Sequence, residues 1–517
     1  AAFAAPYITF KISPHVAGES PYPIATAFLL GIFSILCLSL RHSRKYDERY
    51  TEIPYATKAL PLVGHAISYK SDPVSFLLSQ PFPIFRVNFA SRRMIVIRGD
   101  AVAASSIARA PESAMSARQA VEEVGFGKML GMRNVHSGTQ LHKRLLKDKM
   151  LGKKWGWARR CLRTALVEAM DVETLGKGAG ATVQVPDLLH LVRRVVLRAS
   201  LCVYVGKNIV VNGNDGLLDD MMIFQDAVEN ATATGAVLPR TIADYACWRP
   251  VERKRRTLVI RLAGRLECAW GGSDEDLGPW ARSFRETGMG EEEAADLIIG
   301  LLFAAHKNPA IGGAQSFLYL MTEGTAEVVE KARRGASARV AFMEGRVEGD
   351  DINVGGRADD EILGRIAKET LRLTAHTIGA IRVAQKDFPI PSPHDPKKEY
   401  IVRRGETVAL SHVPSNLDRH SWGDNSEAFD PHRREWTEPG RWKPDSYKFT
   451  TFSHGVHYCP GERIAQEIIE NILALLLERG AKIVGDVPPV SFERATLAQR
   501  GSYVVVQIRR GQSSRKN

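Results

Sequence analysis

One stretch organises the chain, Phe452-Ser-His-Gly-Val-His-Tyr-Cys-Pro-Gly461, and an apolar segment from Ile464 to Leu477 follows it directly. The glycines of the stretch allow backbone N–H groups to turn towards the Cys459 sulfur, and the dipoles at the start of a following helix favour negative charge there. We therefore expect a thiolate that binds a soft metal centre. The apolar residues recur at helical spacing, so the helix should bury one face and hold the loop rigidly.

Two other interpretations of this stretch stay open. His454, His457 and Cys459 could form most of a zinc site, but no second ligand cluster supplies the fourth ligand of a closed site. Cys459 could also be an ordinary buried cysteine, since free cysteines often are. The glycines fixed around it argue against that.

The pattern Phe-x-x-Gly-x-His-x-Cys-x-Gly resembles the haem-ligand signature of the cytochrome P450 family. The resemblance implies a haem b iron bound axially by Cys459, whose electron-rich sulfur favours O–O cleavage. It further implies that His457 donates to a haem propionate and that Phe452 packs near the sulfur. Gly455 and Gly461 would shape the loop. The implied fold is mainly α-helical, a haem-thiolate fold with a small β-rich lobe.

A second constellation is Lys368-Glu-Thr-Leu-Arg-Leu373, in which Glu369 and Arg372 share one side of a helix. Alone this pair is weak evidence, because most such pairs lie on a surface. Its position before Phe429-Asp-Pro-His-Arg433 and the cysteine loop is similar to the order in the family. The resemblance then implies that Glu369, Arg372 and Arg433 form a buried charge network that retains the haem.

The resemblance also implies further cations at the haem propionates. Arg382 lies in the segment Ile378–Asp387, which begins as a strand. The basic helix that starts at Gln140-Leu-His-Lys-Arg-Leu-Leu-Lys147 offers Arg144 or His142. Most such charge runs are solvated helix faces, and the sequence does not decide between the two residues.

The match with the family breaks at Leu301-Leu-Phe-Ala-Ala-His-Lys-Asn-Pro-Ala310, inside a helical pattern from Glu291 to about Met321. Its register resembles that of the family's central helix, which runs over the distal face of the haem. Ala305, His306 and Asn308 are therefore our candidate catalytic residues.

Two residues of this helix depart from the family pattern. Lys307 stands where members that split dioxygen carry an acid, and Asn308 stands where they carry threonine. Pro309 has no N–H, so we expect a kink and a polar groove there. A plainer alternative is that Asn308 only satisfies the freed carbonyl and Lys307 points to solvent.

Composition sets wider limits on the class of protein. A chain of 517 residues exceeds the size of one hydrophobic core, so one lobed unit or two domains are expected. The net charge of +12 favours an acidic membrane face or an acidic partner protein. Nucleic acid is a poor choice, because no basic stripe is interleaved with aromatic residues. The six cysteines are scattered, which indicates a reducing compartment.

The first sixty residues are interpreted as an anchor and a linker. We expect a short lumenal tail at 1–19, a transmembrane helix at 20–40, a basic and proline-containing linker at 41–60, and a catalytic haem domain at 61–517. The cationic flank after residue 40 predicts a cytosolic catalytic domain in the endoplasmic reticulum membrane. A cleaved signal peptide is the alternative, but no basic leader or clear cleavage site is present.

Within the globular part, Ile84–Phe89 and Met94–Ile97 predict a β-hairpin, and helical periods dominate after it. Residues 122–138 are predicted to be a loop, and residues 335–360 an irregular connection. The basic cluster Arg253–Arg256 is interpreted as a solvated helix face.

These observations together predict a haem-thiolate monooxygenase that oxidises a lipophilic small molecule such as a terpenoid, steroid or polyketide in biosynthesis. The resemblance implies a microsomal member, of the type found in fungal secondary metabolism, with electrons from an NADPH-cytochrome reductase. Asparagine at 308 resembles both certain sterol hydroxylases and the branch of the family that isomerises peroxides without added oxygen, so a haem-thiolate isomerase or dehydratase is the alternative. A non-catalytic haem-binding sensor is a distant third and would need an attached output domain.

Overall fold

The computed structural model describes residues 50–61, 63–89, 92–125, 141–174, 181–210, 216–235, 238, 240–345, 358–395, 397–438, 446–494 and 497–509. The chain divides into two compact units, Ala1–Thr51 and Glu52–Asn517. In the first unit only the strand β1 (Tyr50–Thr51) is described. The predicted tail and anchor, and residues 41–49 of the predicted linker, lie outside these residues. Within them, no helix has the length and apolar character needed to cross a membrane.

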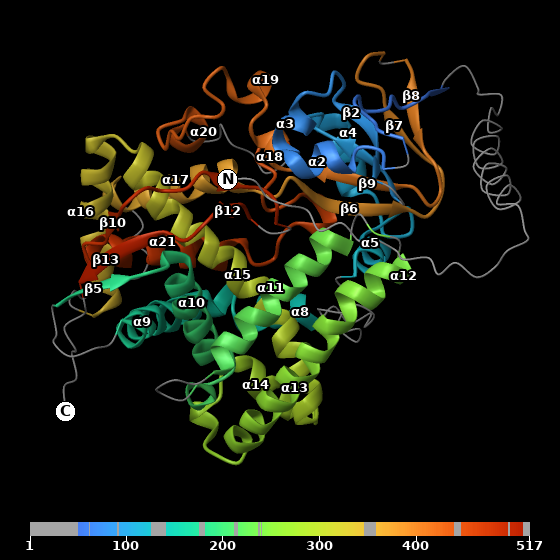
Figure 1. Cartoon of the computed structure of the whole chain (residues 1–517). Helices are drawn as coiled ribbons and strands as arrows, with labels where there is room; N and C mark the ends of the chain where they lie inside the picture. Colours follow the sequence, from blue (N-terminus) through green and yellow to red (C-terminus); the bar gives the residue numbers. More distant parts are fainter. Residues whose placement is uncertain are drawn as a thin grey trace, which may run out of the picture. The chain divides into compact units, whose positions relative to one another are not determined.

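The second unit is mainly helical, as predicted (Figure 1). Its α-helices are α2 (Ala66–Ser71), α3 (Pro73–Leu78), α4 (Ala101–Arg109), α5 (Ala117–Glu123), α8 (Leu141–Lys149), α9 (Trp155–Glu173), α10 (Leu188–Tyr204), α11 (Leu217–Gly235), α12 (Arg240–Ala243), α13 (Arg249–Trp270), α14 (Pro279–Glu286), α15 (Glu291–Glu323), α16 (Ala326–Met343), α17 (Ala358–Thr374), α18 (Val413–Asn416), α19 (Arg419–Trp422), α20 (Arg434–Thr437) and α21 (Glu462–Glu478). Short 3₁₀ turns are η1 (Gly152–Lys154), η2 (Lys207–Ile209), η4 (Asp274–Asp276) and η7 (Gly455–His457), and η3 (Asp244–Trp248) is a π turn.

A five-stranded sheet has the order β2-β3-β9-β6-β4. Its strands are β2 (Ile84–Phe89), β3 (Arg92–Ile97), β4 (Met115–Ser116), β6 (Ile378–Ala384) and β9 (Thr407–Ser411). The predicted hairpin is confirmed, because β2 pairs antiparallel with β3 and joins Ile84 to Ile97. β3 then pairs parallel with β9, and β6 pairs antiparallel with β9, with a bulge between Gly379 and Ile381.

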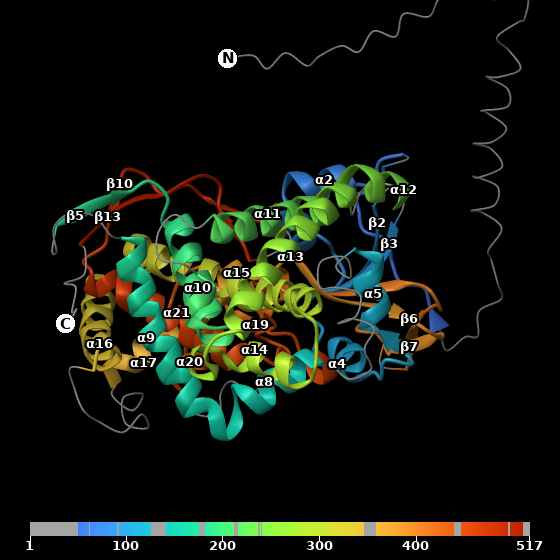
Figure 2. The ribbon, with the colours of Figure 1, turned by 90° about the horizontal axis from the view of Figure 1, so that it is seen from below.

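Smaller strand pairs complete the β-structure of this unit. β7 (Phe388–Pro391) pairs with β8 (Glu399–Val402), β11 (Val490–Ser491) with β12 (Gln499–Arg500), and β13 (Val505–Arg509) lies between β5 (Thr182–Val185) and β10 (Lys482–Val484). Figures 1 and 2 place β2, β3 and β6 on one side of the unit and α9, α10 and α16 on the other.

The central helix α15 organises the helical core. It packs against α10, α13, α17 and α21, and its first turn carries three glutamates that suit the positive end of the helix dipole. Close packing on α21 depends on small residues. A Cβ on Gly312 would lie 2.7 Å from Ile469, and one on Gly313 would lie 2.8 Å from Ile472. The two helices therefore form one rigid block.

The predicted helix after the cysteine loop is confirmed as α21, but its burial was underestimated. Residues 471–477 are buried on every side, not on one face, because α21 lies against α9, α15, α16 and α17. The irregular connection predicted from residue 335 is wrong for residues 335–343, which belong to α16. There Gly335 is buried in a helix whose packing outweighs the low helix propensity of glycine.

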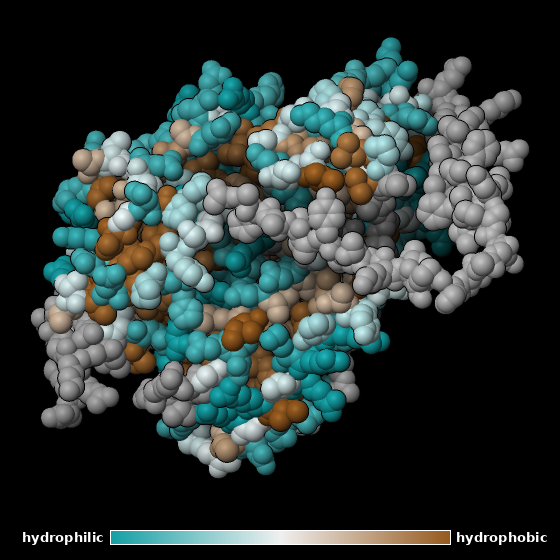
Figure 3. Space-filling view, viewed as in Figure 1, coloured by the Kyte–Doolittle hydropathy of each residue, from teal (hydrophilic) through white to brown (hydrophobic). Residues whose placement is uncertain are grey.

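The basic cluster Arg253–Arg256 lies on α13, and Arg253, Lys254 and Arg256 are exposed, which confirms a solvated helix face. In Figure 3 the end of the unit formed by α13 and α14 is mostly hydrophilic. Of the predicted loop at 122–138, residues 122–123 end α5, and residues 126–138 lie outside the described part of the chain. The five described cysteines are all free.

Candidate functional site

The cysteine loop is held on both sides of Cys459. The Cys459 N–H donates to the Phe452 carbonyl at 2.9 Å, which closes the loop before α21 begins. Gly455 has φ of 65° and lies so close to α4 that a Cβ would meet the Ala108 carbonyl oxygen at 2.2 Å. Only glycine fits there without strain. Phe452 packs edge-on against Phe449, with ring centroids 6.1 Å apart. The sulfur therefore sits on a loop with little freedom to move.

The electrostatics of Cys459 combine two opposing effects. Burial raises the pKa of the Cys459 thiol, and the backbone N–H groups of Gly461 and Glu462 lower it without overcoming the burial. The sequence anticipated the N–H groups but not the larger cost of burial. Gly461 is the N-cap of α21, and a Cβ there would lie 4.0 Å from the Cys459 sulfur, at ordinary van der Waals distance.

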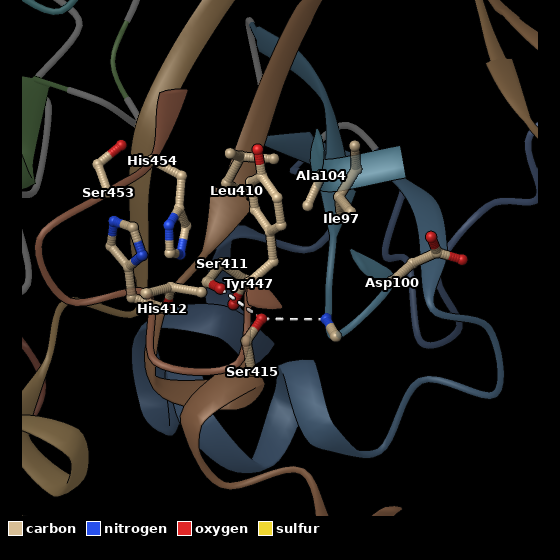
Figure 4. A pocket seen from close by; sticks show the side chains of 12 residues that line it. Ile97, Asp100, Ala104, Leu410, Ser411, His412, Ser415, Tyr447, Ser453 and His454 are labelled. Atoms are coloured by element: carbon tan, nitrogen blue, oxygen red, sulfur yellow. Dashed lines mark hydrogen bonds between the residues drawn. The ribbon is translucent and has the colours of Figure 1, made fainter. Parts of the chain in front are cut away.

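A small pocket of about 10 Å³ lies behind the loop (Figure 4). In this view Ser453 and His454 of the loop lie on the same side as His412, which precedes α18. Ser415 of α18 accepts a hydrogen bond from the Gly99 N–H at 3.0 Å and so ties α18 to the start of α4. A pocket of this volume holds at most one water molecule, so the residues behind the loop are closely packed.

The central helix α15 presents one accessible face. Leu301, Ala304, Ala305 and Asn308 are partly or fully exposed, whereas the residues between them are buried. This spacing of three and four residues defines one side of a helix. The face consists of two alanines, a leucine and one amide, and at the two alanines a flat group could approach the helix backbone closely.

His306 and Lys307 lie on the other side of α15. The His306 ring is fully buried, and its Nε2 donates to the Arg193 carbonyl of α10 at 2.8 Å. Burial, followed by the charge of Arg193, lowers the His306 pKa to about 3. A neutral ring fixed in this way joins two helices and does not reach the face that carries Asn308.

The alternative in which Lys307 points to solvent is wrong. Only 1% of its side chain is exposed, and its Nζ donates to Asp226 at 2.7 Å and to Glu229 at 2.5 Å, both on α11. Arg193 also pairs with Asp226 at 3.0 Å. Burial lowers the pKa of Lys307 in spite of the attraction of Glu229. Sequence reasoning missed both acids, because they lie about eighty residues away in the chain.

Asn308 lies on the accessible face, and its Oδ1 accepts a hydrogen bond from the Leu497 N–H at 3.4 Å. Pro309 follows it inside a helix that continues without interruption to Glu323. The amide of Asn308 therefore retains its N–H donors for a water or a ligand.

Two of the predicted propionate-binding residues come together from distant segments. His457 Nε2 lies 3.2 Å from the Glu112 carboxylate, and the buried Arg382 of β6 also experiences the charge of Glu112. The same carboxylate thus contacts one of the two predicted carboxylate-binding groups and acts on the other through its charge. Glu112 itself was missed by sequence reasoning. Of the two candidates in α8, the described side chain is that of Arg144, and it is exposed.

The charge network around Glu369 is fully assembled. Arg372 donates to both Glu369 oxygens through Nε at 2.8 Å and Nη2 at 2.7 Å, and Arg433 Nε donates at 2.8 Å. Trp436 Nε1 and the Asp430 N–H complete the carboxylate at 3.0 Å each. Burial alone would raise the Glu369 pKa, but these donors and the two cations hold it below the usual value. The network fixes the segment before the cysteine loop onto α17.

The residues present fit a haem. A rigid loop offers one sulfur, α15 offers an accessible face with two alanines, and His457 and Arg382 both interact with the Glu112 carboxylate. The zinc alternative has no support, since no group of three or more histidine, cysteine or acidic residues suited to a metal ion occurs in the described ranges.

Comparison with known proteins agrees with this geometry. The family model for cytochrome P450 matches residues 282–491. The chain is 24% identical over 491 residues to sterol 14-demethylase of Arabidopsis thaliana, which covers 90% of this chain and 93% of that protein. It is also 24% identical over 498 residues to obtusifoliol 14-alpha demethylase of Sorghum bicolor, covering 93% and 95%, and 21% identical over 469 residues to lanosterol 14-alpha demethylase of Bos taurus, covering 88% and 87%.

The fold and the cysteine loop define a mainly helical haem-thiolate oxidoreductase. The chain belongs to the cytochrome P450 family. It is accordingly a monooxygenase that uses haem with a thiolate ligand and electrons from NADPH through a reductase.

Proposed function

We propose that this monooxygenase oxidises a lipophilic, polycyclic small molecule of the terpenoid, steroid or polyketide class at a haem held by Cys459. The observation that carries the proposal is the constrained Cys459 loop, packed on the same helical block as the accessible face of α15. The relatives named as sterol 14-demethylases support a substrate of this size and polarity.

A cavity of about 220 Å³ supports the same substrate class. Apolar groups dominate its lining, among them Phe89, Met94, Ile378, Ile381 and Phe492. Sites with mostly apolar walls and a few polar groups are typical of small lipophilic ligands. The cavity lies beside β6, the strand that carries Arg382, so a substrate in it would lie close to the proposed haem position.

Each residue of the site has a proposed part in the reaction. When bound, haem supplies an iron centre that activates dioxygen. Cys459 would bind the iron through its sulfur, and His457 and Arg382 would hold the propionates, with Arg144 as a further candidate. Ala305 would leave room for the bound group, and Asn308 would hold a water through its amide. His306 joins α15 to α10 through its hydrogen bond to Arg193, and so holds the accessible face of α15 in a fixed position.

We further propose a single-pass anchor at residues 20–40 in the endoplasmic reticulum membrane, with the catalytic unit in the cytosol and an NADPH-cytochrome reductase as partner. The basic flank after residue 40 and the net charge of +12 support this placement. Removing residues 1–44 should abolish carbonate-resistant membrane binding and retain haem. Membrane binding that survives carbonate would contradict the single anchor.

A peroxide isomerase is the second candidate function, and Asn308 is the observation that favours it, because its amide can hold a peroxide as well as a water. The test supplies candidate substrates without oxygen and without NADPH. Strict dependence on both supports the monooxygenase, whereas full product formation in their absence would establish the isomerase. Asn308→Thr should retain monooxygenase activity, or improve the coupling of electron use to product, but should impair an isomerase.

A further inference from the structure

The apolar cavity is bordered by two segments that are distant in sequence. Thr232–Thr234 form the last turn of α11, and Phe492–Arg494 follow β11. Both segments line the same space, together with residues of the sheet. The distance between these two segments therefore helps to set how large a molecule can enter.

Arg494 connects the two segments by charge. Its Nη1 lies 3.5 Å from the Glu229 carboxylate and 4.0 Å from Asp226, one to two turns before Thr232 on α11. The side chain of Arg494 is 45% exposed, whereas that of Glu229 is 2% exposed. The pair thus has a solvated cation on one side and a buried anion on the other.

Glu229 is also held by a residue of the central helix α15. Lys307 of α15 donates to the same carboxylate at 2.5 Å and is fully buried. The buried link between α11 and α15 therefore holds the anion in place, and the exposed link to Arg494 is the weaker of the two, because water and salt screen it. Opening the cavity would break the Arg494 link first.

We propose that Arg494 is a positioning residue that limits the entry of bulky ligands by holding Phe492–Arg494 against α11. This inference rests on the proposed function, because it takes the cavity as the route to the haem. Phe492, two residues before Arg494, is the apolar side chain that this ion pair would keep in the cavity. Small ligands need less opening and should depend less on the pair.

The test uses the haem-loaded full chain and two azole probes that bind haem iron and shift its absorbance. Clotrimazole serves as the bulky probe and imidazole as the small one, with association rates measured by stopped flow. Arg494→Gln should raise the rate for clotrimazole about two- to fivefold, the range expected for loss of an exposed ion pair, and leave imidazole nearly unchanged. Added salt should speed clotrimazole binding to the wild type but not to Arg494→Gln.

Arg419→Gln is the matched control, since Arg419 of α19 forms an exposed pair with Glu427 at 3.6 Å. Arg419→Gln should bind both probes at wild-type rates. Arg494→Lys keeps the positive charge and should bind clotrimazole as slowly as the wild type does. The inference would be overturned if clotrimazole bound Arg494→Gln and Arg419→Gln at equal rates, or if Arg494→Gln changed the rates of both probes equally. Either result would leave the proposed function intact. A wild type whose haem shows no azole shift would overturn the proposed function as well.

Discussion

Replacing Glu369 by glutamine should destabilise the protein strongly, because it leaves two buried arginines without their anion. The side chains of Glu369 and Arg372 are 0% exposed and that of Arg433 is 4% exposed, so solvent screens little of the remaining charge. Glutamine also has only one acceptor oxygen where Glu369 receives five hydrogen bonds. Breaking a buried pair in this way costs about 3–5 kcal/mol, and we expect the upper half of that range.

Urea unfolding of wild type and Glu369→Gln, followed by far-ultraviolet circular dichroism and by haem absorbance, measures this loss. Glu438→Gln is the control, because its partner Arg434 is exposed and solvent screens such a pair, so the stability should hardly change. The folded-state pKa of Glu369 lies below 4.5, so its contribution is present above that pH and is lost as the pH falls further. A Glu369→Gln variant within about 1 kcal/mol of wild type at pH 7 would refute the reasoning.

Three further predictions concern other parts of the site. Gly455→Ala should prevent stable haem incorporation, since its Cβ would overlap the Ala108 carbonyl, whereas Gly290→Ala, with open space around it, should not; the Soret absorbance per chain compares them. Lys307→Met should lower the free energy of unfolding less than Glu369→Gln does, because Arg193 and Arg494 still balance Asp226 and Glu229. If the urea midpoint of unfolding falls equally in the two variants, this prediction is wrong. Stability should fall as the pH drops below about 6.5, by about 1.4 kcal/mol per pH unit for each buried histidine whose pKa is lowered to about 3 or 4, because the unfolded chain takes up these protons first; a stability that stays constant from pH 6.5 to pH 5 would contradict it. These histidines are His306, His376 and His412.

The parts of the fold that local pattern determines could be predicted from the sequence. The hairpin at β2 and β3 is visible in its own β-forming residues, and the helix α21 in the spacing of its own apolar residues. The helix α15 is visible as one long, mostly apolar segment. Gly335 misled the prediction for α16, since a glycine within a charged segment resembles a loop until the packing around it is known. The full burial of α21 depends on four neighbouring helices, which no local pattern reveals.

The same distinction holds for the candidate site. Glu369 and Arg372 are three residues apart, so helix geometry alone brings them together. Lys307, Asp226 and Glu229 meet only because α11 crosses α15, and Glu112 reaches His457 only through the packing of α4 on the cysteine loop. Burial, which reverses the expected direction of the Cys459 pKa, is likewise a property of the folded chain.

The axial ligand is the central claim, and the spectrum of the reduced carbon-monoxide complex tests it most directly. Wild type should show the band near 450 nm that marks thiolate-bound haem, and Cys459→Ser should lose it. Cys161→Ser, which removes a half-buried cysteine on α9, should keep the band and serves as the control. A 450 nm band that persists in Cys459→Ser would exclude this residue as the ligand and contradict the account of the site.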